Sequence, residues 1–148
     1  MKRTRILLAD DHPQIRELLR VILEPEFRVV GAAEDGETLL QYAQSLQPDV
    51  IISDINMPKV DGLQAARLLK DIAPHSRVIF LTAHAESSYV DAAFAAGAVG
   101  YLIKGATTDL VGSLRSLIDS VRAQNIAPSI PPRPARPSAP ATGVRPAH

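Results

Sequence analysis

Cysteine is absent from this chain of 148 residues, and no apolar run is long enough to cross a membrane. The lack of cysteine excludes disulfides, thiol catalysis and zinc sites built on cysteine, and it is typical of a protein of the reducing cytoplasm. A membrane span needs about 18 consecutive apolar residues. The first apolar run, residues 6–9, is also too short for the core of a signal peptide. We therefore expect a soluble, cytoplasmic protein that makes no contact with a membrane.

The chain as a whole also has no net charge. The chain carries 16 basic and 16 acidic residues, but residues 126–148 hold three of the arginines and no acid. Residues 1–125 therefore have 13 basic and 16 acidic groups, a net charge of −3. Nucleic-acid binding usually depends on a basic patch, so we expect no direct binding of nucleic acid by this chain.

The composition changes after Asn125. Residues 126–148 contain seven of the twelve prolines, with alanine, arginine and serine, and no aromatic residue. Such a segment buries too little apolar surface to offset its ordering entropy, so we predict a disordered tail with polyproline II character. It is either a solvated tail, which the composition favours, or a ligand for a proline-binding groove. We expect residues 1–125 to form one folded domain.

Strand-like and helix-like segments alternate along that domain. Short continuous apolar runs are typical of strands buried on both faces, and apolar residues at helical spacing separate them. The predicted strands are 5–10, 27–33, 49–54, 77–82 and 99–103. The predicted helices run from near Pro13 to Leu23, over 36–46, from about 62 to 72, over 87–96 and over 107–124. Five such units predict an α/β protein, with a parallel sheet covered by helices on both faces.

Polar residues follow four of these predicted strands. Asp10 and Asp11 follow the first, Asp54 the third, Thr82 ends the fourth and Lys104 follows the fifth. In an open parallel sheet, functional groups gather at the carboxyl ends of the strands. Three carboxylates, a hydroxyl and an ammonium at one edge can hold a divalent cation such as Mg²⁺ and transfer a phosphoryl group.

Each of these residues also has a structural interpretation. Asp10 and Asp11 could simply favour the dipole of the following helix, although adjacent carboxylates repel each other unless something compensates them. Asp54 is either a nucleophile that forms an acyl phosphate or an ordinary turn residue. Thr82 and Lys104 either contact phosphoryl oxygens or are a strand-end residue and a solvated surface lysine.

Two further positions have a possible role. Asn56 could offer its backbone carbonyl to the metal, or it is a turn residue. Tyr101 is either an amphipathic residue of the last strand or a rotamer switch. No histidine has the spacing of a metal ligand, so we interpret all four as surface or loop residues; they are His12, His75, His84 and His148.

Taken together, these residues resemble the receiver domain of two-component response regulators. The resemblance spans about residues 4–123. Its motifs are Asp10-Asp11, Asp54 with Met57-Pro58 and Gly62, Thr82-Ala83, Ala96-Gly97-Ala98 before Gly100-Tyr101, and Lys104. Residues 100–106 are similar to receivers of the NarL/FixJ type, which usually precede a helix-turn-helix domain. No such domain follows in this chain.

The resemblance implies a flavodoxin-like (βα)5 three-layer sandwich with a parallel sheet in the order 2-1-3-4-5. It implies that Asp54 takes a phosphoryl group from a phosphohistidine on a sensor histidine kinase or a histidine phosphotransfer protein. Asp11, Asp54 and the carbonyl of Asn56 would hold Mg²⁺, with Asp10 acting mainly through water.

The resemblance also implies a switch. Lys104 and Thr82 would bind the phosphoryl oxygens, and Thr82 and Tyr101 would then move inward. The surface of the fourth helix, fifth strand and fifth helix would repack for an output protein, as a shift between two packed states. A homodimer through the fourth or fifth helix is possible by resemblance. Many receivers have proline after the lysine; here Gly105 follows, which leaves the geometry of that peptide open.

The favoured hypothesis is a stand-alone receiver, phosphorylated on Asp54 and signalling through protein contacts. It would be a signalling phosphoacceptor rather than an enzyme, although it could catalyse its own Mg²⁺-dependent phosphotransfer and dephosphorylation. One alternative is a receiver-like scaffold that does not use phosphorylation, and another is the receiver of a transcription regulator without its DNA-binding domain. A flavodoxin would share only the fold, because residues 10–13 are not a hydroxyl-rich phosphate loop.

Overall fold

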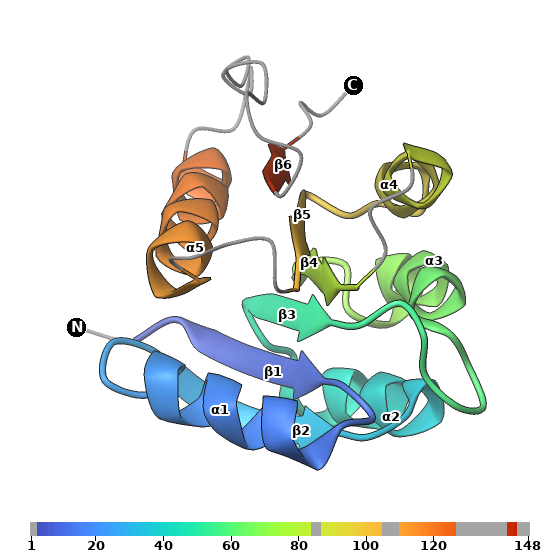
Figure 1. The fold of residues 1–148 in the computed structure, drawn as a ribbon, viewed down its shortest axis with the longest axis horizontal. Coiled ribbons are helices and arrows are strands. Elements are labelled where there is room, and N and C mark those ends of the chain that lie inside the picture. Colours follow the sequence, from blue (N-terminus) through green and yellow to red (C-terminus); the bar gives the residue numbers. More distant parts are fainter. Residues whose placement is uncertain (1–2, 84–86, 105–109, 127–141, 145–148) are drawn as a thin grey trace.

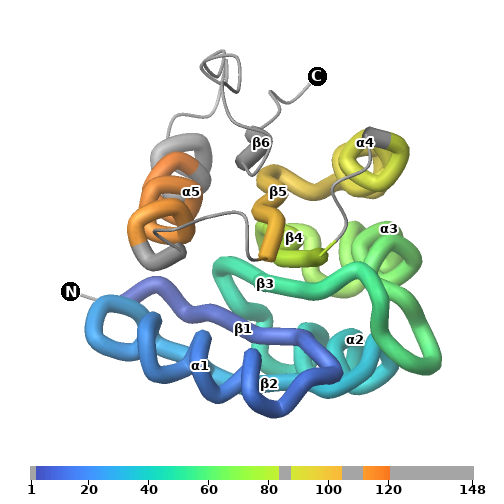
Figure 2. The backbone as a smooth tube through the Cα atoms, in the orientation of Figure 1, coloured from blue at the N-terminus to red at the C-terminus, as the bar shows by residue number. Residues whose placement is uncertain are grey.

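The computed structural model describes residues 3–83, 87–104, 110–126 and 142–144 (Figure 1). Its strands are β1 (Arg5–Ala9), β2 (Arg28–Ala33), β3 (Val50–Ser53), β4 (Arg77–Thr82), β5 (Gly100–Ile103) and β6 (Thr142–Val144). Its helices are α1 (Pro13–Leu23), α2 (Gly36–Leu46), α3 (Gly62–Ile72), α4 (Ser87–Ala95) and α5 (Leu110–Ile126). The predicted alternation is confirmed from β1 to α5, and the backbone can be followed through it in Figure 2.

The strands form a single sheet in the order β2-β1-β3-β4-β5-β6. The four pairings from β2 to β5 are parallel, so the predicted order 2-1-3-4-5 is confirmed. Ala9 pairs with Ser53, and Thr82 pairs with Ile103. These pairings bring the carboxyl ends of β1, β3, β4 and β5 to the same edge of the sheet, which explains why the polar residues that follow them meet.

Helices cover both faces of the sheet, giving the three layers seen in Figure 1. On one face, Leu19 of α1 and Leu117 of α5 belong to a buried cluster with side chains of the strands. On the other face, Leu39 of α2, Ala66 of α3 and Ala93 of α4 belong to a second cluster. All residues of β3 and β5 are buried, as expected for strands with a helix layer on either side. Each fully buried leucine or isoleucine contributes about 1.5–3 kcal/mol to this core.

The starts of the helices are fixed by local chemistry. Pro13 occupies the first turn of α1, where its missing N–H costs nothing. Asp35 and Asp61 cap α2 and α3, because each side chain accepts a hydrogen bond from a backbone N–H in the first turn.

Within the part of the chain that the structure describes, none of the helices combines the length and apolarity needed to cross a bilayer.

The structure differs from the sequence expectation at residues 142–144, which lie in the tail predicted to be disordered. They form β6, which pairs antiparallel with β5 through Gly100–Val144 and Leu102–Thr142. Without β6, β5 would be an edge strand with unpaired N–H and C=O groups. Residues 142–144 contain no proline, so they can donate hydrogen bonds to that edge. Helix α5 also continues to Ile126, and the other residues of the predicted tail lie outside the described residues.

Candidate functional site

Four of the predicted site residues converge at the carboxyl edge of the sheet. Lys104 joins two of them, since its Nζ donates to Asp10 Oδ2 at 2.6 Å and to Asp54 Oδ2 at 3.1 Å. Thr82 lies on β4, between β3 and β5, and lines the same cavity as Asp54 and Lys104. Asp10 and Asp54 are buried, so their charges meet in a region where water screens them weakly.

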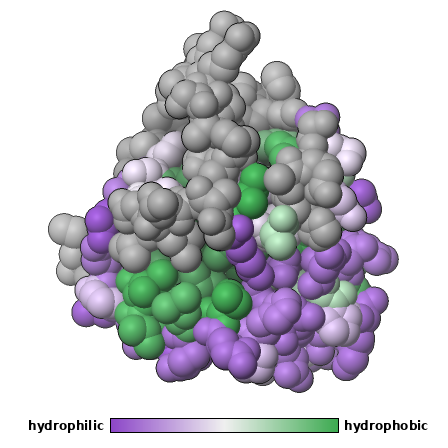
Figure 3. Space-filling view, in the orientation of Figure 1, coloured by the Kyte–Doolittle hydropathy of each residue, from purple (hydrophilic) through white to green (hydrophobic). Residues whose placement is uncertain are grey.

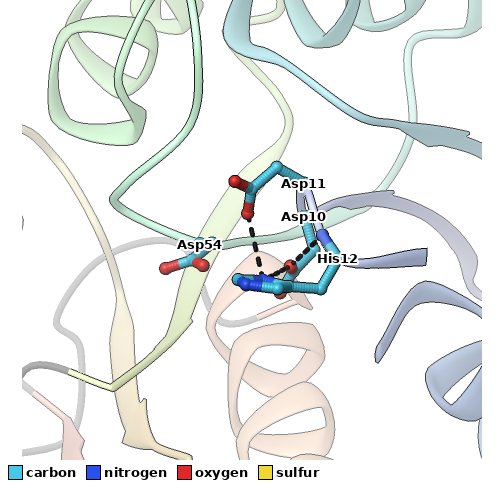
Figure 4. A group of neighbouring side chains, drawn as sticks. All are labelled: Asp10, Asp11, His12 and Asp54. Carbon is cyan, nitrogen blue, oxygen red and sulfur yellow. Dashed lines mark hydrogen bonds and ion pairs between the residues drawn. The ribbon is translucent and has the colours of Figure 1, made fainter. Parts of the chain in front are cut away.

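The acidic residues form one cluster with His12 (Figure 4). Asp10, Asp11, His12 and Asp54 each place one potential ligand atom within 4.8 Å of the others. The Asp11 side chain is 34% exposed, and that of His12 is 62% exposed. The cluster is therefore closed by buried carboxylates on its inner side and open to solvent on its outer side, as an ion or a small ligand requires.

Lys104 is the cation among these carboxylates. Burial by itself lowers the pKa of the ammonium, but the hydrogen bonds from Lys104 to Asp10 and Asp54, together with their negative charges, outweigh it. The net result is a pKa above its ordinary value of 10.5. Lys104 therefore stays protonated at neutral pH, and its charge offsets part of the repulsion between Asp10 and Asp54.

A cavity of about 350 Å³ opens at this edge; it is lined by Asp11, His12, Ile15, Asp54, Asn56, Thr82, Ala83 and Lys104. Thr82 is fully buried, and its hydroxyl Oγ1 has no hydrogen-bond partner among the described residues. A buried hydroxyl without a partner costs about 1–3 kcal/mol, so folding alone does not favour it. Next to it, Ala83 adds only a methyl group to the cavity wall. The hydroxyl is therefore available to a ligand oxygen in the cavity.

The loop after β3 holds Asp54 by several short contacts. The N–H of Ile55 donates to Asp54 Oδ1 at 2.7 Å, and the hydroxyl of Ser53 donates to the Asp54 carbonyl at 2.8 Å. The loop then folds back, because the N–H of Gly62 donates to the Ile55 carbonyl at 2.6 Å. A Cβ on Gly62 would lie 2.2 Å from the Asp54 carbonyl oxygen, so only glycine permits this approach.

The loop after β1 is fixed in a similar way. Asp10 Oδ1 accepts a hydrogen bond from the backbone N–H of His12 at 2.9 Å, which turns the chain into α1. From the first turns of α1, Arg16 Nη1 donates to the Asp10 carbonyl at 2.6 Å. The acidic pair thus sits on a loop that is hydrogen-bonded on both sides, and Asn56 lies opposite it, exposed at the mouth of the cavity.

Some predicted residues lie outside this cavity. Tyr101 is 1% exposed and packs against Phe80, with ring centroids 6.5 Å apart. It is not among the residues that line the cavity. Its ring is inside the core, which differs from the interpretation as an amphipathic residue of the last strand; the rotamer switch stays a prediction. Gly105 and His84 lie outside the described residues.

Sequence reasoning missed the positions of His12 and Arg16. His12 was expected to be an ordinary loop residue, and its ring is largely exposed, but its Nδ1 lies 3.0 Å from Asp10 Oδ1 and 3.1 Å from Asp11 Oδ1. The signal was its place directly after the acidic pair. Arg16 could have been suspected because it follows His12 by one helical turn, on the face that points back at the loop.

Residues 6–115 match the family described as the response regulator receiver domain. The transcriptional regulatory protein DegU of Brevibacillus brevis is 41% identical over 122 residues, which cover 81% of this chain and 49% of DegU. The chain spans about half the length of the first curated relatives that it matches.

Solved structures agree with this family and fold. The receiver domain of the putative response regulator NarL from Mycobacterium tuberculosis has a TM-score of 0.75 and 31% identity, covering 82% of this chain and 98% of that chain. The isolated receiver domain of RcsB from Salmonella enterica serovar Typhimurium, solved with the phosphomimetic BeF3⁻, has a TM-score of 0.71 and 30% identity, covering 80% of this chain and 90% of that chain. This chain therefore belongs to the response regulator receiver domain family of two-component systems.

Proposed function

We propose that this chain is a phosphorylatable receiver in which Asp54 accepts a phosphoryl group from a phosphohistidine on a partner protein. One arrangement carries the proposal: the ammonium of Lys104 contacts Asp10 and Asp54 beside the buried hydroxyl of Thr82, which has no hydrogen-bond partner in the described part of the chain. A cation and a buried hydroxyl that line one cavity are what the oxygens of a phosphoryl group on Asp54 would bind.

The groups that this chain would contribute to the transfer are already close together. A carboxylate oxygen of Asp54 attacks phosphorus, a new O–P bond forms, and the P–N bond to the donor imidazole breaks with its electron pair going to the ring. Lys104 then exchanges its contact with Asp54 for one with a phosphoryl oxygen, and the Thr82 hydroxyl donates to another. The protein contributes mainly positioning and charge neutralisation, as is usual in phosphoryl transfer.

The donor set fits Mg²⁺, which prefers oxygen ligands and retains several waters. We propose that Asp11, Asp54 and the backbone carbonyl of Asn56 hold it directly. Asp10 would act through water, since its Oδ2 is already 2.6 Å from Lys104 Nζ. When bound, the ion neutralises charge on the phosphoryl oxygens and on the carboxylates.

An apolar face on α1 supports a protein as the phosphoryl donor. Leu18 and Val21 are 50% and 60% exposed, and Figure 3 shows an apolar patch over this helix. Ile15, on the same helix, lines the cavity, so the patch and the cavity adjoin. A helical phosphohistidine domain of a sensor histidine kinase or histidine phosphotransfer protein could pack on this patch and present its histidine to Asp54.

We propose that the signal leaves as a stand-alone receiver would send it, by protein contacts of α4, β5 and α5. Thr82 and Tyr101 lie on neighbouring strands, so movement of the hydroxyl toward a phosphoryl group can change how the Tyr101 ring packs. This surface would contact an output protein or a second copy of the chain. The acidic balance of residues 1–125 supports a protein target over nucleic acid.

Intact-protein mass spectrometry tests the proposal. The wild type and the variants Asp54→Ala and Asp49→Ala are incubated with acetyl phosphate, with and without Mg²⁺. We expect a single phosphoryl adduct on the wild type and on Asp49→Ala that requires Mg²⁺, and none on Asp54→Ala. Absence of an adduct on the wild type, together with failure to bind beryllofluoride, would support the scaffold alternative instead.

A further inference from the structure

The loop from Asp54 to Gly62, here called the Asp54 loop, contacts the start of α2 at a place that the proposed chemistry does not use. Figures 1 and 2 show this loop curving past the first turn of α2. Lys59 Nζ lies 3.7 Å from Asp35 Oδ2. The Asp35 side chain is 8% exposed and that of Lys59 is 59% exposed, so a surface cation meets a buried carboxylate.

Asp35 uses its two oxygens in different ways. Oδ1 accepts a hydrogen bond from the N–H of Thr38 at 2.7 Å and caps α2, while Oδ2 faces Lys59. The Thr38 hydrogen bond is the main reason that the pKa of Asp35 lies below its ordinary value of 3.8; burial opposes this effect, and the charge of Lys59 adds to it. Asp35 is therefore ionised at neutral pH and can attract Lys59.

The backbone at this contact is tightly constrained. Lys59 has a φ of 70°, in the left-handed region that residues other than glycine rarely adopt. Such a conformation persists where its surroundings hold it in place. On the facing side, the N–H of Gly36 donates to the Pro58 carbonyl at 3.4 Å. A Cβ on Gly36 would lie 1.8 Å from the Val60 carbonyl oxygen, so the Asp54 loop occupies the space that a side chain would need.

We propose that Asp35, Gly36 and Lys59 form a brace that positions the Asp54 loop and so holds Asn56 at the wall of the acidic cavity. Asn56 lies between Asp54 and the braced residues, and it lines the cavity. The loop is anchored at its two ends by Asp54 and Gly62, and the brace fixes its middle. The three residues act through the loop and are positioning residues; the part concerning Asn56 rests on the proposed function.

Two substitutions remove the ion pair without disturbing the helix cap or the core. Asparagine caps helices as well as aspartate does, so Asp35→Asn keeps the hydrogen bond to Thr38 and loses only the charge. Lys59→Met removes the charge from the other side, and Lys59→Arg restores it. Arg67→Met, on the exposed side of α3, is the matched control for loss of a cation.

Hydrogen exchange of the loop amides in the metal-free protein is the first measurement. We expect exchange over residues 56–61 to rise roughly two- to fivefold in Asp35→Asn and in Lys59→Met, the range for one partly exposed ion pair. The double variant should match either single variant, because both remove the same interaction. Lys59→Arg should restore the wild-type rate, and Arg67→Met should leave it unchanged.

Mg²⁺ affinity, measured by calorimetry, is the second measurement. It should fall by a similar factor in the two single variants and recover in Lys59→Arg. Unchanged loop exchange in both single variants, or additive effects in the double variant, would overturn the brace. Failure of the wild type to form an adduct would overturn the proposed function alone, since the exchange experiment needs neither metal nor phosphate.

Gly36→Ala tests the close approach of the backbones. The added methyl group must displace the loop near Val60, so we expect faster loop exchange than in either ion-pair variant. Exchange equal to that of the wild type in a folded Gly36→Ala protein would contradict the proposed packing. If this variant does not fold, the ion-pair variants still decide the question.

Discussion

The two ends of the parallel sheet carry the same kinds of polar residues but use them differently. At the amino end, Asp49 Oδ2 accepts a hydrogen bond from the N–H of Arg5 at 2.8 Å, and the Asp49 carbonyl accepts one from Arg77 at 3.0 Å. The hydroxyl of Ser76 donates to the Pro48 carbonyl. These polar groups join neighbouring strands, and each hydrogen bond pairs a donor with an acceptor. The fold alone therefore explains them.

At the carboxyl end, the polar groups are not satisfied in this way. Asp10 and Asp54 are buried and share one ammonium, that of Lys104, while Asp11 adds a third carboxylate to the same cluster. The Thr82 hydroxyl has no partner within the described residues. One ammonium offsets only part of the charge of three carboxylates, and burial of the Thr82 hydroxyl adds a further cost to folding; groups held at a cost in a cavity are typical of functional sites. The polar groups at the amino end thus serve the fold, whereas those at the carboxyl end are arranged to bind a ligand.

Removal of Lys104 should have the largest effect on the carboxyl end of the sheet. In Lys104→Met, Asp10 and Asp54 lose their shared cation, and we expect the free energy of unfolding to fall by about 3 kcal/mol. Adduct formation from acetyl phosphate should slow by about 10²-fold, because a donor to the phosphoryl group is lost. Thermal unfolding with and without Mg²⁺ checks the cause: the ion should raise the melting temperature more in the variant than in the wild type. Equal shifts would contradict the proposed role of Lys104.

Thr82→Val should separate stability from activity. Valine has nearly the same shape but no hydroxyl. The variant should therefore gain about 1 kcal/mol of stability, because it removes a buried group that has no partner in the described ranges. Adduct formation should nevertheless become slower. Ser53→Ala is the matched control, since its hydroxyl does have a partner, and it should lose stability by about 1 kcal/mol. The free energy of unfolding is measured in urea. If it changes in the same direction in both variants, the Thr82 hydroxyl does have a partner in the folded protein.

Asp49→Ala is the counterpart at the amino end. The variant loses the acceptor for the Arg5 N–H, so the free energy of unfolding should fall by about 1 kcal/mol. Adduct formation should be unchanged, since Asp49 lies at the opposite end of the sheet. A clear loss of adduct in Asp49→Ala would mean that the two ends are not independent.

The pH dependence of stability gives the smallest effect. The pKa of Lys104 is raised in the folded protein above its ordinary value of 10.5. Its contribution to stability is therefore complete below pH 10.5 and is lost as the pH rises through the higher, folded-state pKa. Urea unfolding above pH 10.5 should show a steeper loss for the wild type than for Lys104→Met. If the free energy of unfolding falls equally with pH in the wild type and in Lys104→Met, the carboxylates do not stabilise the Lys104 ammonium in the folded state.

The fold could be predicted well from the sequence because its signals are local. Buried strands and helical spacing gave β1 to β5 and α1 to α5 in the correct order, with boundaries within a few residues. The convergence of Asp10, Asp54, Thr82 and Lys104 followed from the rule for parallel sheets. In contrast, β6 forms because residues 142–144 pair with β5, which lies far from them in the sequence. No local sequence pattern predicts such a pairing.

The finer features of the site could not be read from the sequence. That Lys104 contacts Asp10 more closely than Asp54 depends on side-chain packing across β1, β3 and β5. That the Thr82 hydroxyl has no partner among the described residues is a property of its surroundings, not of its residue type. His12 had no recognisable metal-ligand spacing, yet the turn after β1 places its ring between two carboxylates.

The most direct test of the central claim is to locate the phosphoryl group. The wild-type protein is treated with acetyl phosphate and Mg²⁺, the acyl phosphate is reduced with borohydride, and the modified residue is identified by peptide mass spectrometry. The account predicts a single modified residue, Asp54, and no modification without Mg²⁺. Modification of Asp10 or Asp11 in place of Asp54, or labelling spread over acidic residues at both ends of the sheet, would contradict it.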